Sequence, residues 1–208
     1  EARRAKITGS IAKSVVPLTR GTDRTPAGFW QLVGEMLTIM PIEEKPIDRG
    51  HRLENEAVEK LSKAIGLKFN LDPQMWQSDT DEAQALSPDG AEPGDKPTYA
   101  AEAKNLCAGK HFKYLYKSRH FKGNPIDLVP NEATASYKEQ VIQYFVVNNY
   151  LNTLYFVLHC PEAAYAEHEL VVITIHRVDV LDLIAAQDLQ QKEILNKVRE
   201  IVKELIPA

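Results

Sequence analysis

The alternation of helical and β-rich segments is the sequence feature that most constrains how this chain can fold. Apolar residues recur at helical spacing in the segments 48–65, 133–150 and 194–205. Short runs rich in β-branched and aromatic residues occur at 67–71, 75–77, 83–87, 98–104, 153–159 and 169–176. Because strands alternate with helices, we expect an α/β (α+β) fold in which helices flank a central mixed β-sheet.

The segments between these elements complete the prediction. Two further helices are expected near the start of the chain, at residues 7–16 and 28–40. Residues 88–97 are rich in glycine and proline and predict a turn between two strands, and residues 118–131 are expected to form a loop. The last helix is expected to pack on the core through an apolar stripe. This stripe consists of Ile194, Leu195, Val198, Ile201, Val202 and Leu205. A chain of 208 residues suits one domain, so we expect a single domain over residues 1–208.

Composition excludes several classes of protein and site. Hydrophobic residues make up 44% and charged residues 26% of the chain, which is typical of a globular domain. No apolar run is long enough to cross a membrane, and residues 1–6 are not followed by the apolar segment of a signal peptide. Cys107 and Cys160 form no CxxC motif, and the histidines show no HExxH spacing. We therefore expect two reduced thiols and no zinc or iron–sulfur site.

Charge is distributed unevenly along the chain, although the net charge is only −4. Residues 103–126 contain no acid, and neither do residues 2–22, which hold five basic residues. The basic residues of 103–126 are Lys104, Lys110, Lys113, Lys117, Arg119 and Lys122, interleaved with Phe112, Tyr114, Tyr116 and Phe121. This pattern predicts either a basic groove that grips DNA by backbone charge and stacking, or a solvated loop and helix face.

Two acids and a lysine form the pattern with the clearest chemistry. Asp89 lies in the segment Ser87-Pro88-Asp89-Gly90, and Glu102 and Lys104 follow on the next predicted strand. Paired strands bring side chains together on one face, and residues two apart on a strand point to the same side. Two carboxylates there suit a hard cation such as Mg²⁺, beside which a lysine can orient and activate water. The pattern indicates phosphodiester hydrolysis; the alternative is a hairpin with a surface Glu–Lys pair.

Two predicted helices carry polar residues among apolar ones. Glu54 lies on the apolar stripe of the helix at 48–65, so its carboxylate either has a metal, cation or hydrogen-bonding partner or reaches water from the edge of the stripe. Gln140 and Tyr144 are four residues apart and share a helix face, and Gln143 is nearby. These groups either contact a phosphate or a metal-bound water, or are satisfied inside a core helix.

Taken in order, these motifs resemble the lambda exonuclease family, also called the YqaJ-type viral recombinase family. This family belongs to the PD-(D/E)xK restriction-endonuclease-like superfamily, and the resemblance covers residues 3–161. Its elements are Arg3 with Ile7-Thr8-Gly9-Ser10, the GxxxExxA helix at 50–57, Ser87-Pro88-Asp89-Gly90, Glu102-Ala103-Lys104, and the glutamine helix at 136–141. The resemblance implies a restriction-endonuclease-like core.

The same resemblance implies roles for individual residues. The implied metal-side residues are Asp89, Glu102, Glu54, Asp79 and the carbonyl of Ala103. Lys104 would help to activate the attacking water. The residues implied to hold the terminal phosphate and the scissile strand are Arg3, Ser10, Ser87, and Gln140 or Gln143. The sequence departs from the family in two places: Asn105-Leu106 replaces the common Cys-Pro, and Gln-Val-Ile-Gln replaces Gln-Val-Gln, which leaves both glutamines open.

The function implied by the resemblance is two-metal hydrolysis of double-stranded DNA from its ends. The family digests DNA in the 5′→3′ direction with Mg²⁺, for which Mn²⁺ can substitute, and leaves a 3′ single strand for phage-type recombination. It also implies a ring-shaped homotrimer, a single-strand annealing protein as partner, and a phage or prophage protein in the cytoplasm of a bacterial host. The alternatives are an endonuclease on the same fold, which would cut closed circular DNA, and a non-catalytic DNA-binding module. The intact set of Asp89, Glu102 and Lys104 argues against the module.

Overall fold

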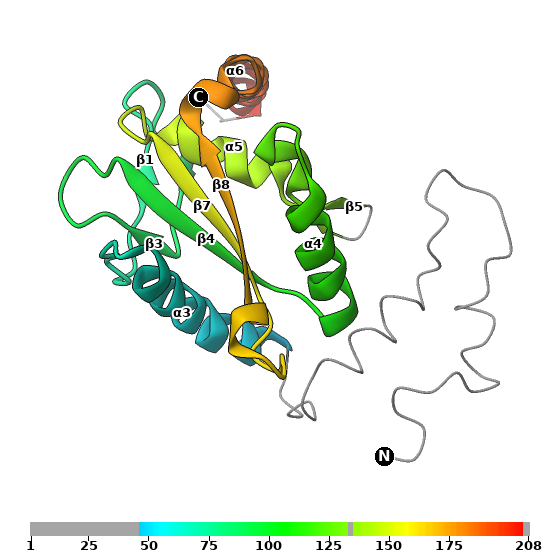
Figure 1. Cartoon of the computed structure of the whole chain (residues 1–208). Coiled ribbons are helices and arrows are strands. Elements are labelled where there is room, and N and C mark those ends of the chain that lie inside the picture. Colours follow the sequence, from blue (N-terminus) through cyan, green and yellow to red (C-terminus); the bar gives the residue numbers. More distant parts are fainter. Residues whose placement is uncertain (1–45, 133–134, 206–208) are drawn as a thin grey trace, which may run out of the picture. The chain divides into compact units, whose positions relative to one another are not determined.

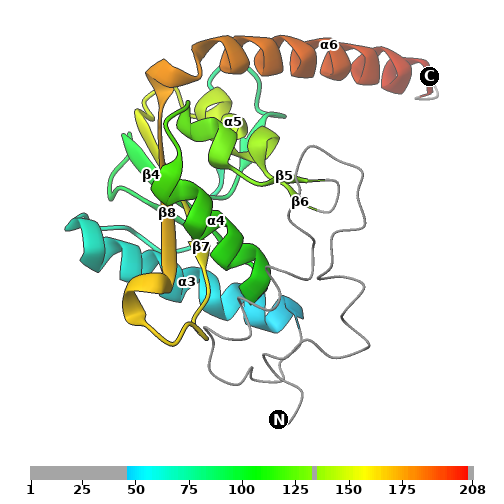
Figure 2. The same ribbon diagram turned by 45° about the vertical axis from the view of Figure 1, so that its right-hand side comes forward.

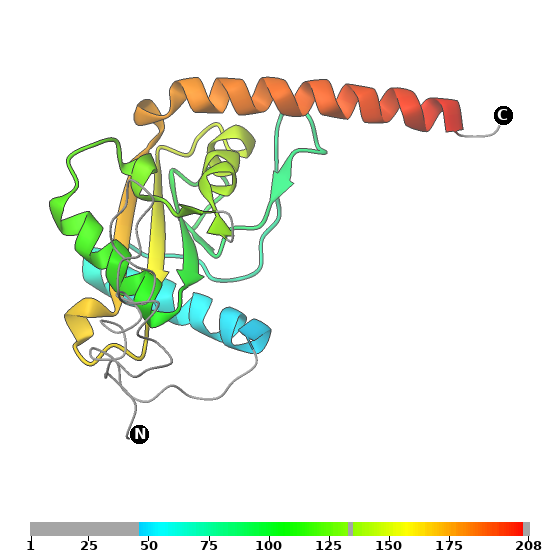
Figure 3. The same ribbon diagram turned by 90° about the vertical axis from the view of Figure 1, so that its right-hand side faces the viewer.

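A four-stranded mixed sheet forms the centre of the protein. The computed structural model describes residues 46–132 and 135–205 (Figure 1). The strands of the sheet lie in the order β3 (Gly90–Ala91), β4 (Tyr99–Asn105), β7 (Thr153–His159) and β8 (Leu170–His176). β3 is antiparallel to β4, whereas β4 and β7 point in the same direction in Figure 3. Parallel neighbours need a long crossover, and here it includes a helix. The predicted mixed sheet with helices is confirmed.

Within residues 46–132 and 135–205, four helices accompany the sheet, together with short elements between them. The helices are α3 (Pro46–Ile65), α4 (Ala108–His120), α5 (Lys138–Val147) and α6 (Leu181–Leu205). Three short 3₁₀ helices are formed by Pro125–Leu128, Ala166–His168 and Arg177–Asp179. Two small hairpins pair β1 (Trp76–Gln77) with β2 (Ala85–Leu86), and β5 (Asn131–Glu132) with β6 (Ala135–Ser136). None of the helices in this part of the chain has the length and apolarity needed to cross a membrane.

Several predicted elements are confirmed, and others are wrong in their extent. The helix predicted at 48–65 is α3, which begins two residues earlier at a proline, a residue favoured in a first helical turn. The predicted turn at 88–97 contains β3, and the run at 67–71 forms only an isolated bridge between Asn70 and Ala91. The predicted loop at 118–131 includes the end of α4 and a 3₁₀ helix. The helices expected at 7–16 and 28–40 lie outside the described residues.

The prediction that the apolar stripe of the last helix packs on the core is wrong for three of the four members whose side chains are described, and the fourth, Leu195, is half-buried. Ile194 is 61% exposed, Val198 49% and Ile201 55%. The reason is length: α6 has 25 residues and α5 has 10, so α6 is roughly 20 Å longer than the helix it packs against. Figures 2 and 3 show the first half of α6 beside α5 and its second half extending past it.

The chain divides into two compact units, each made of three segments. The first comprises Glu1–Leu61, Ala103–Lys122 and Val157–Val172, and the second comprises Ser62–Glu102, Gly123–Phe156 and Ile173–Ala208. β4, β7 and β8 each contribute residues to both units.

In the first unit, Lys60 of α3 lies at the centre of a group of interacting polar side chains. Its Nζ lies 2.7 Å from Oε1 of Glu56 and also donates to a carboxylate oxygen of Glu169. The imidazole of His159 is fully buried, with its Nε2 3.4 Å from the Lys60 Nζ and its Nδ1 3.2 Å from Oδ1 of Asn105. Burial, followed by the positive charge of Lys60, lowers the pKa of His159 to about 4.

We expect this histidine to make the protein less stable in mild acid. Its unfolded-state pKa is about 6.5, so between about pH 6.5 and pH 4 the unfolded chain binds a proton that the folded chain does not. Stability therefore falls as the pH falls, and His159 alone lowers the free energy of unfolding by about 2 kcal/mol between pH 7 and pH 5. Urea denaturation at both pH values should show a smaller drop for His159→Gln than for the parent. The exposed-site control His120→Gln should keep the full drop; equal drops in all three proteins would contradict the assignment.

In the second unit, most of the residues of α5 are buried. Its buried residues are Val141, Ile142, Tyr144, Phe145, Val146 and Val147. Arg177 closes the end of this helix: its guanidinium donates to the carbonyls of Phe145 and Asn148, at 2.8 and 2.6 Å, and to that of Leu151 at 2.7 Å. A helix leaves its last carbonyls without partners, and one side chain here satisfies three carbonyls at and after its end.

Candidate active site

The carboxylate of Glu102 is the centre of the candidate site. Glu102 lies on β4 and is only 1% exposed. Nε2 of Gln140 donates to its Oε1 at 2.6 Å, and the hydroxyl of Tyr144 donates to its Oε2. The two donors stand one turn apart on α5, so one helix face supplies a hydrogen bond to each oxygen. A buried carboxylate needs such donors, because leaving water is costly for a charged group.

Asp89 is the second acid of the site, and strand pairing places it. β3 pairs with β4 so that Gly90 lies opposite Ala101 and Ala91 opposite Ala100. Extending this register by one residue puts Asp89 opposite Glu102, where antiparallel neighbours have their Cβ atoms about 5 Å apart. Asp89 thus lies directly before β3, in the segment that was predicted to be a turn.

The environment of Tyr144 shows that both acids lie near it. Burial, followed by the negative charges of Glu102 and Asp89, holds the pKa of Tyr144 well above its usual value. The hydroxyl therefore keeps its proton and remains a donor to Glu102. It also lies 3.5 Å from the carbonyl oxygen of Ala101.

Gln143 and Ser87 use their polar groups away from Glu102. Oε1 of Gln143 accepts hydrogen bonds from Gln187, at 3.0 Å, and from Gln191, both on α6. The hydroxyl of Ser87 is exposed and donates to the carbonyl of Gln74 at 2.6 Å. Of the two glutamines left open by the sequence, Gln140 is the one that contacts the acid.

The remaining predicted residues occupy several places. Asp79 is exposed in the turn between β1 and β2. In the first unit, Glu54 is half-buried on α3, and the fully buried Ala103 and half-buried Lys104 follow Glu102 on β4. Arg3 and Ser10 lie outside the described residues. The roles predicted for these six residues and for Ser87 stay predictions.

The donor set around Glu102 suits a hard cation. Among residues 46–132 and 135–205, no group of three or more His, Cys, Asp or Glu side chains is arranged to hold a metal. Mg²⁺, however, keeps several waters and is commonly held by only one or two carboxylates. Asp89 directly precedes β3, and the register of β3 and β4 extended by one residue puts it opposite Glu102, so the two acids provide that number of oxygen ligands.

Tyr144 is a contact of Glu102 for which the sequence predicted no role apart from the helix face that it shares with Gln140. A tyrosine inside a run of valine, isoleucine and phenylalanine has the pattern of a core aromatic. Its four-residue spacing from Gln140 was the available signal, because that spacing puts both side chains on one helix face. The structure shows that this face meets Glu102.

Comparison with known proteins places this geometry in a family and a fold. The sequence profile of a family described as "YqaJ-like viral recombinase domain" matches residues 1–150. An alkaline exonuclease from Laribacter hongkongensis, LHK-Exo, has a similar structure, with a TM-score of 0.52 and 18% identity over 99% of this chain and 97% of that one. LHK-Exo in complex with dAMP gives a TM-score of 0.53 and 17% identity, covering 98% and 94%. No curated protein sequence matches the chain. The predicted restriction-endonuclease-like fold is confirmed.

Proposed function

The chain belongs to the YqaJ-like viral recombinase family, and on this premise we propose that it is a metal-dependent exonuclease that hydrolyses phosphodiester bonds of double-stranded DNA. The observation that carries the proposal is the buried carboxylate of Glu102, held by Gln140 and Tyr144 and paired in register with Asp89. A fold shared with an alkaline exonuclease supports it. We also propose that residues 1–208 act as a single nuclease domain.

Mg²⁺ is the proposed cofactor, with Mn²⁺ as a possible substitute. Asp89, Glu102 and the carbonyl of Ala103 would hold it, and Glu54 and Asp79 are proposed as further acids on the metal side. When bound, the cation supplies Lewis-acid activation of water and stabilises charge on the phosphate. Hard oxygen ligands of this kind favour Mg²⁺ over softer metals.

The protein's own residues are proposed to orient the reacting groups. Gln140 and Tyr144 fix both oxygens of Glu102, which keeps the carboxylate in one orientation. Lys104, two residues further along β4, is proposed to orient the attacking water and to stabilise the charge that develops on the phosphate. Ser87, together with Arg3 and Ser10, is proposed to bind the phosphate at the DNA end; its hydroxyl can accept a hydrogen bond while it donates to Gln74.

The biological setting is proposed from the family. We propose digestion in the 5′→3′ direction during phage-type homologous recombination, by a homotrimer that works with a single-strand annealing protein. The corresponding location is the cytoplasm of a bacterial host.

Digestion of linear duplex DNA tests this proposal. Substrates with a 5′-phosphate or a 5′-hydroxyl are incubated with and without Mg²⁺, using the parent, Lys104→Ala and the exposed-site control Lys63→Ala. We expect Mg²⁺-dependent release of nucleotides from the phosphorylated end by the parent and the control, and at least a hundredfold slower release by Lys104→Ala. Internal cuts in closed circular DNA would indicate an endonuclease instead. No digestion of any substrate would reject the nuclease.

A further inference from the structure

The exposed face of α4 combines positive charge with aromatic rings. Helical spacing places Lys110, Lys113, Tyr116, Lys117 and His120 on one face of this helix. The opposite side carries the buried residues of α4, which are His111, Phe112 and Tyr114. Tyr116 is 57% exposed and its ring stacks near that of His120, with centroids 4.8 Å apart. Phe121, directly after the helix, is 37% exposed.

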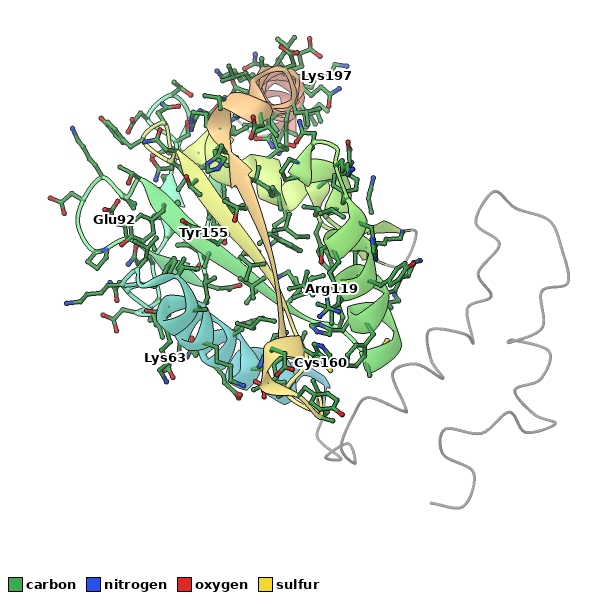
Figure 4. All side chains as sticks on the ribbon, in the orientation of Figure 1. Lys63, Glu92, Arg119, Tyr155, Cys160 and Lys197 are labelled. Carbon is green, nitrogen blue, oxygen red and sulfur yellow. The ribbon has the colours of Figure 1, made fainter. Side chains whose placement is uncertain are left out.

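The segment that contains this face has no acidic residue of its own. Residues 103–126 contain no Asp or Glu. Within the described part of the chain, Lys117, Arg119 and Lys122 make no ion pair, and Lys117 instead lies over the ring of Tyr114, 5.6 Å from its centroid. Figure 4 shows Arg119 on α4, in the first unit. Tyr116 and Phe121 add exposed aromatic rings to this charge.

We propose that this face of α4 binds single-stranded DNA, namely the strand that remains when its complement is digested. The proposal rests on the proposed nuclease function. Lysines at positions 113 and 117 stand about 6 Å apart along the helix axis, so they can meet neighbouring phosphates of one strand. Tyr116 and Phe121 offer ring faces beside this charge.

The aromatic rings are what select a single strand over a duplex. Bases in a duplex are stacked on one another, whereas unpaired bases can stack on exposed side-chain rings. Backbone charge alone would attract both kinds of DNA. Stacking tolerates every base, so binding by this face is expected to show little sequence preference.

Fluorescence anisotropy in EDTA tests the face without hydrolysis. Labelled oligo(dT) and a blunt duplex of the same length are titrated with the full chain at several salt concentrations. The variants are Tyr116→Ala with Phe121→Ala, which removes the rings, and Lys113→Glu with Lys117→Glu, which reverses the charge. Lys63→Glu with Lys197→Glu is the matched control, because it makes the same charge change at exposed positions on α3 and α6. Thermal melting checks that each variant folds.

We expect removal of the rings to weaken oligo(dT) binding roughly tenfold and to leave duplex binding within about twofold, with an unchanged salt slope. Charge reversal should weaken binding to both DNAs and reduce the single-strand salt slope by about 1.4. Undiminished oligo(dT) binding without the rings, equal losses for both DNAs, or a control as weak as the charge reversal would each overturn the proposal. A parent that binds oligo(dT) in this way but fails to digest DNA with Mg²⁺ contradicts the nuclease alone and leaves the binding face supported.

Discussion

Replacing Glu102 with glutamine is expected to slow Mg²⁺-dependent digestion of linear duplex DNA roughly thousandfold. The substitution keeps the size of the side chain but removes the negative charge that would hold the cation. One oxygen remains to accept from Gln140, and the new amide can donate to the hydroxyl of Tyr144, so the hydrogen bonds around the group can be kept. The loss of activity should therefore come without a loss of folding.

Two measurements separate these effects. Initial rates of nucleotide release are compared for the parent, Glu102→Gln and the exposed-site control Glu167→Gln, which should match the parent. Thermal melting with and without Mg²⁺ or Mn²⁺ should show a rise in Tm for the parent and the control, because a ligand of the folded state stabilises it. Glu102→Gln should show no rise. A variant that keeps a tenth of the parent rate would show that this carboxylate does not hold the catalytic cation.

The largest effect on stability is expected at Arg177. Replacing it with leucine leaves the carbonyls of Phe145, Asn148 and Leu151 without the guanidinium that they share. Hydrogen bonds to charged groups contribute about 1–3 kcal/mol each, and partial replacement by water reduces the total, so we expect a loss of about 3 kcal/mol. The contact between the guanidinium and the ring of Phe145, 5.5 Å from its centroid, is lost as well.

Thermal melting monitored by circular dichroism measures this loss. A decrease of about 3 kcal/mol corresponds to a Tm that is roughly 6–12 °C lower for a chain of this size. Arg119→Leu removes an arginine from an exposed position on α4 and should leave the Tm nearly unchanged. If the Tm of Arg177→Leu lies within 2 °C of the parent's Tm, water replaces the guanidinium without a loss of stability, and the prediction is wrong.

Local patterns predicted the long elements of the fold well and the short ones poorly. α3, β4 and β7 follow from periodicity and β-branched runs that a reader can see in the sequence. β3 has only two residues, in a segment rich in glycine and proline, and it exists because β4 pairs with it. Pairing of this kind depends on the partner strand, so no local pattern reports it. The burial of the apolar stripe of α6 was predicted wrongly, because amphipathicity shows that one face of a helix is apolar but does not show whether another part of the protein covers that face.

The candidate site shows the same division. The motif order predicted that Asp89 and Glu102 belong together, and the register of β3 and β4 agrees with that. The choice between Gln140 and Gln143 could not come from the sequence, because residues three apart share one broad helix face and the docking of α5 decides which of them faces β4. The role of Tyr144 stayed open for a related reason, since a buried tyrosine and a core phenylalanine occupy similar apolar patterns.

The way α5 completes the site has a consequence for how the chain folds. β3 and β4 are close in sequence, so their pairing closes a short loop and can form early, whereas Gln140 and Tyr144 are 38 and 42 residues from Glu102. Until α5 docks, Glu102 stays hydrated. The burial of the apolar face of α5 then offsets the dehydration of the carboxylate in the same step. A folding intermediate with only the β3–β4 pair would therefore hold both acids side by side in water, without the donors that fix them for a cation.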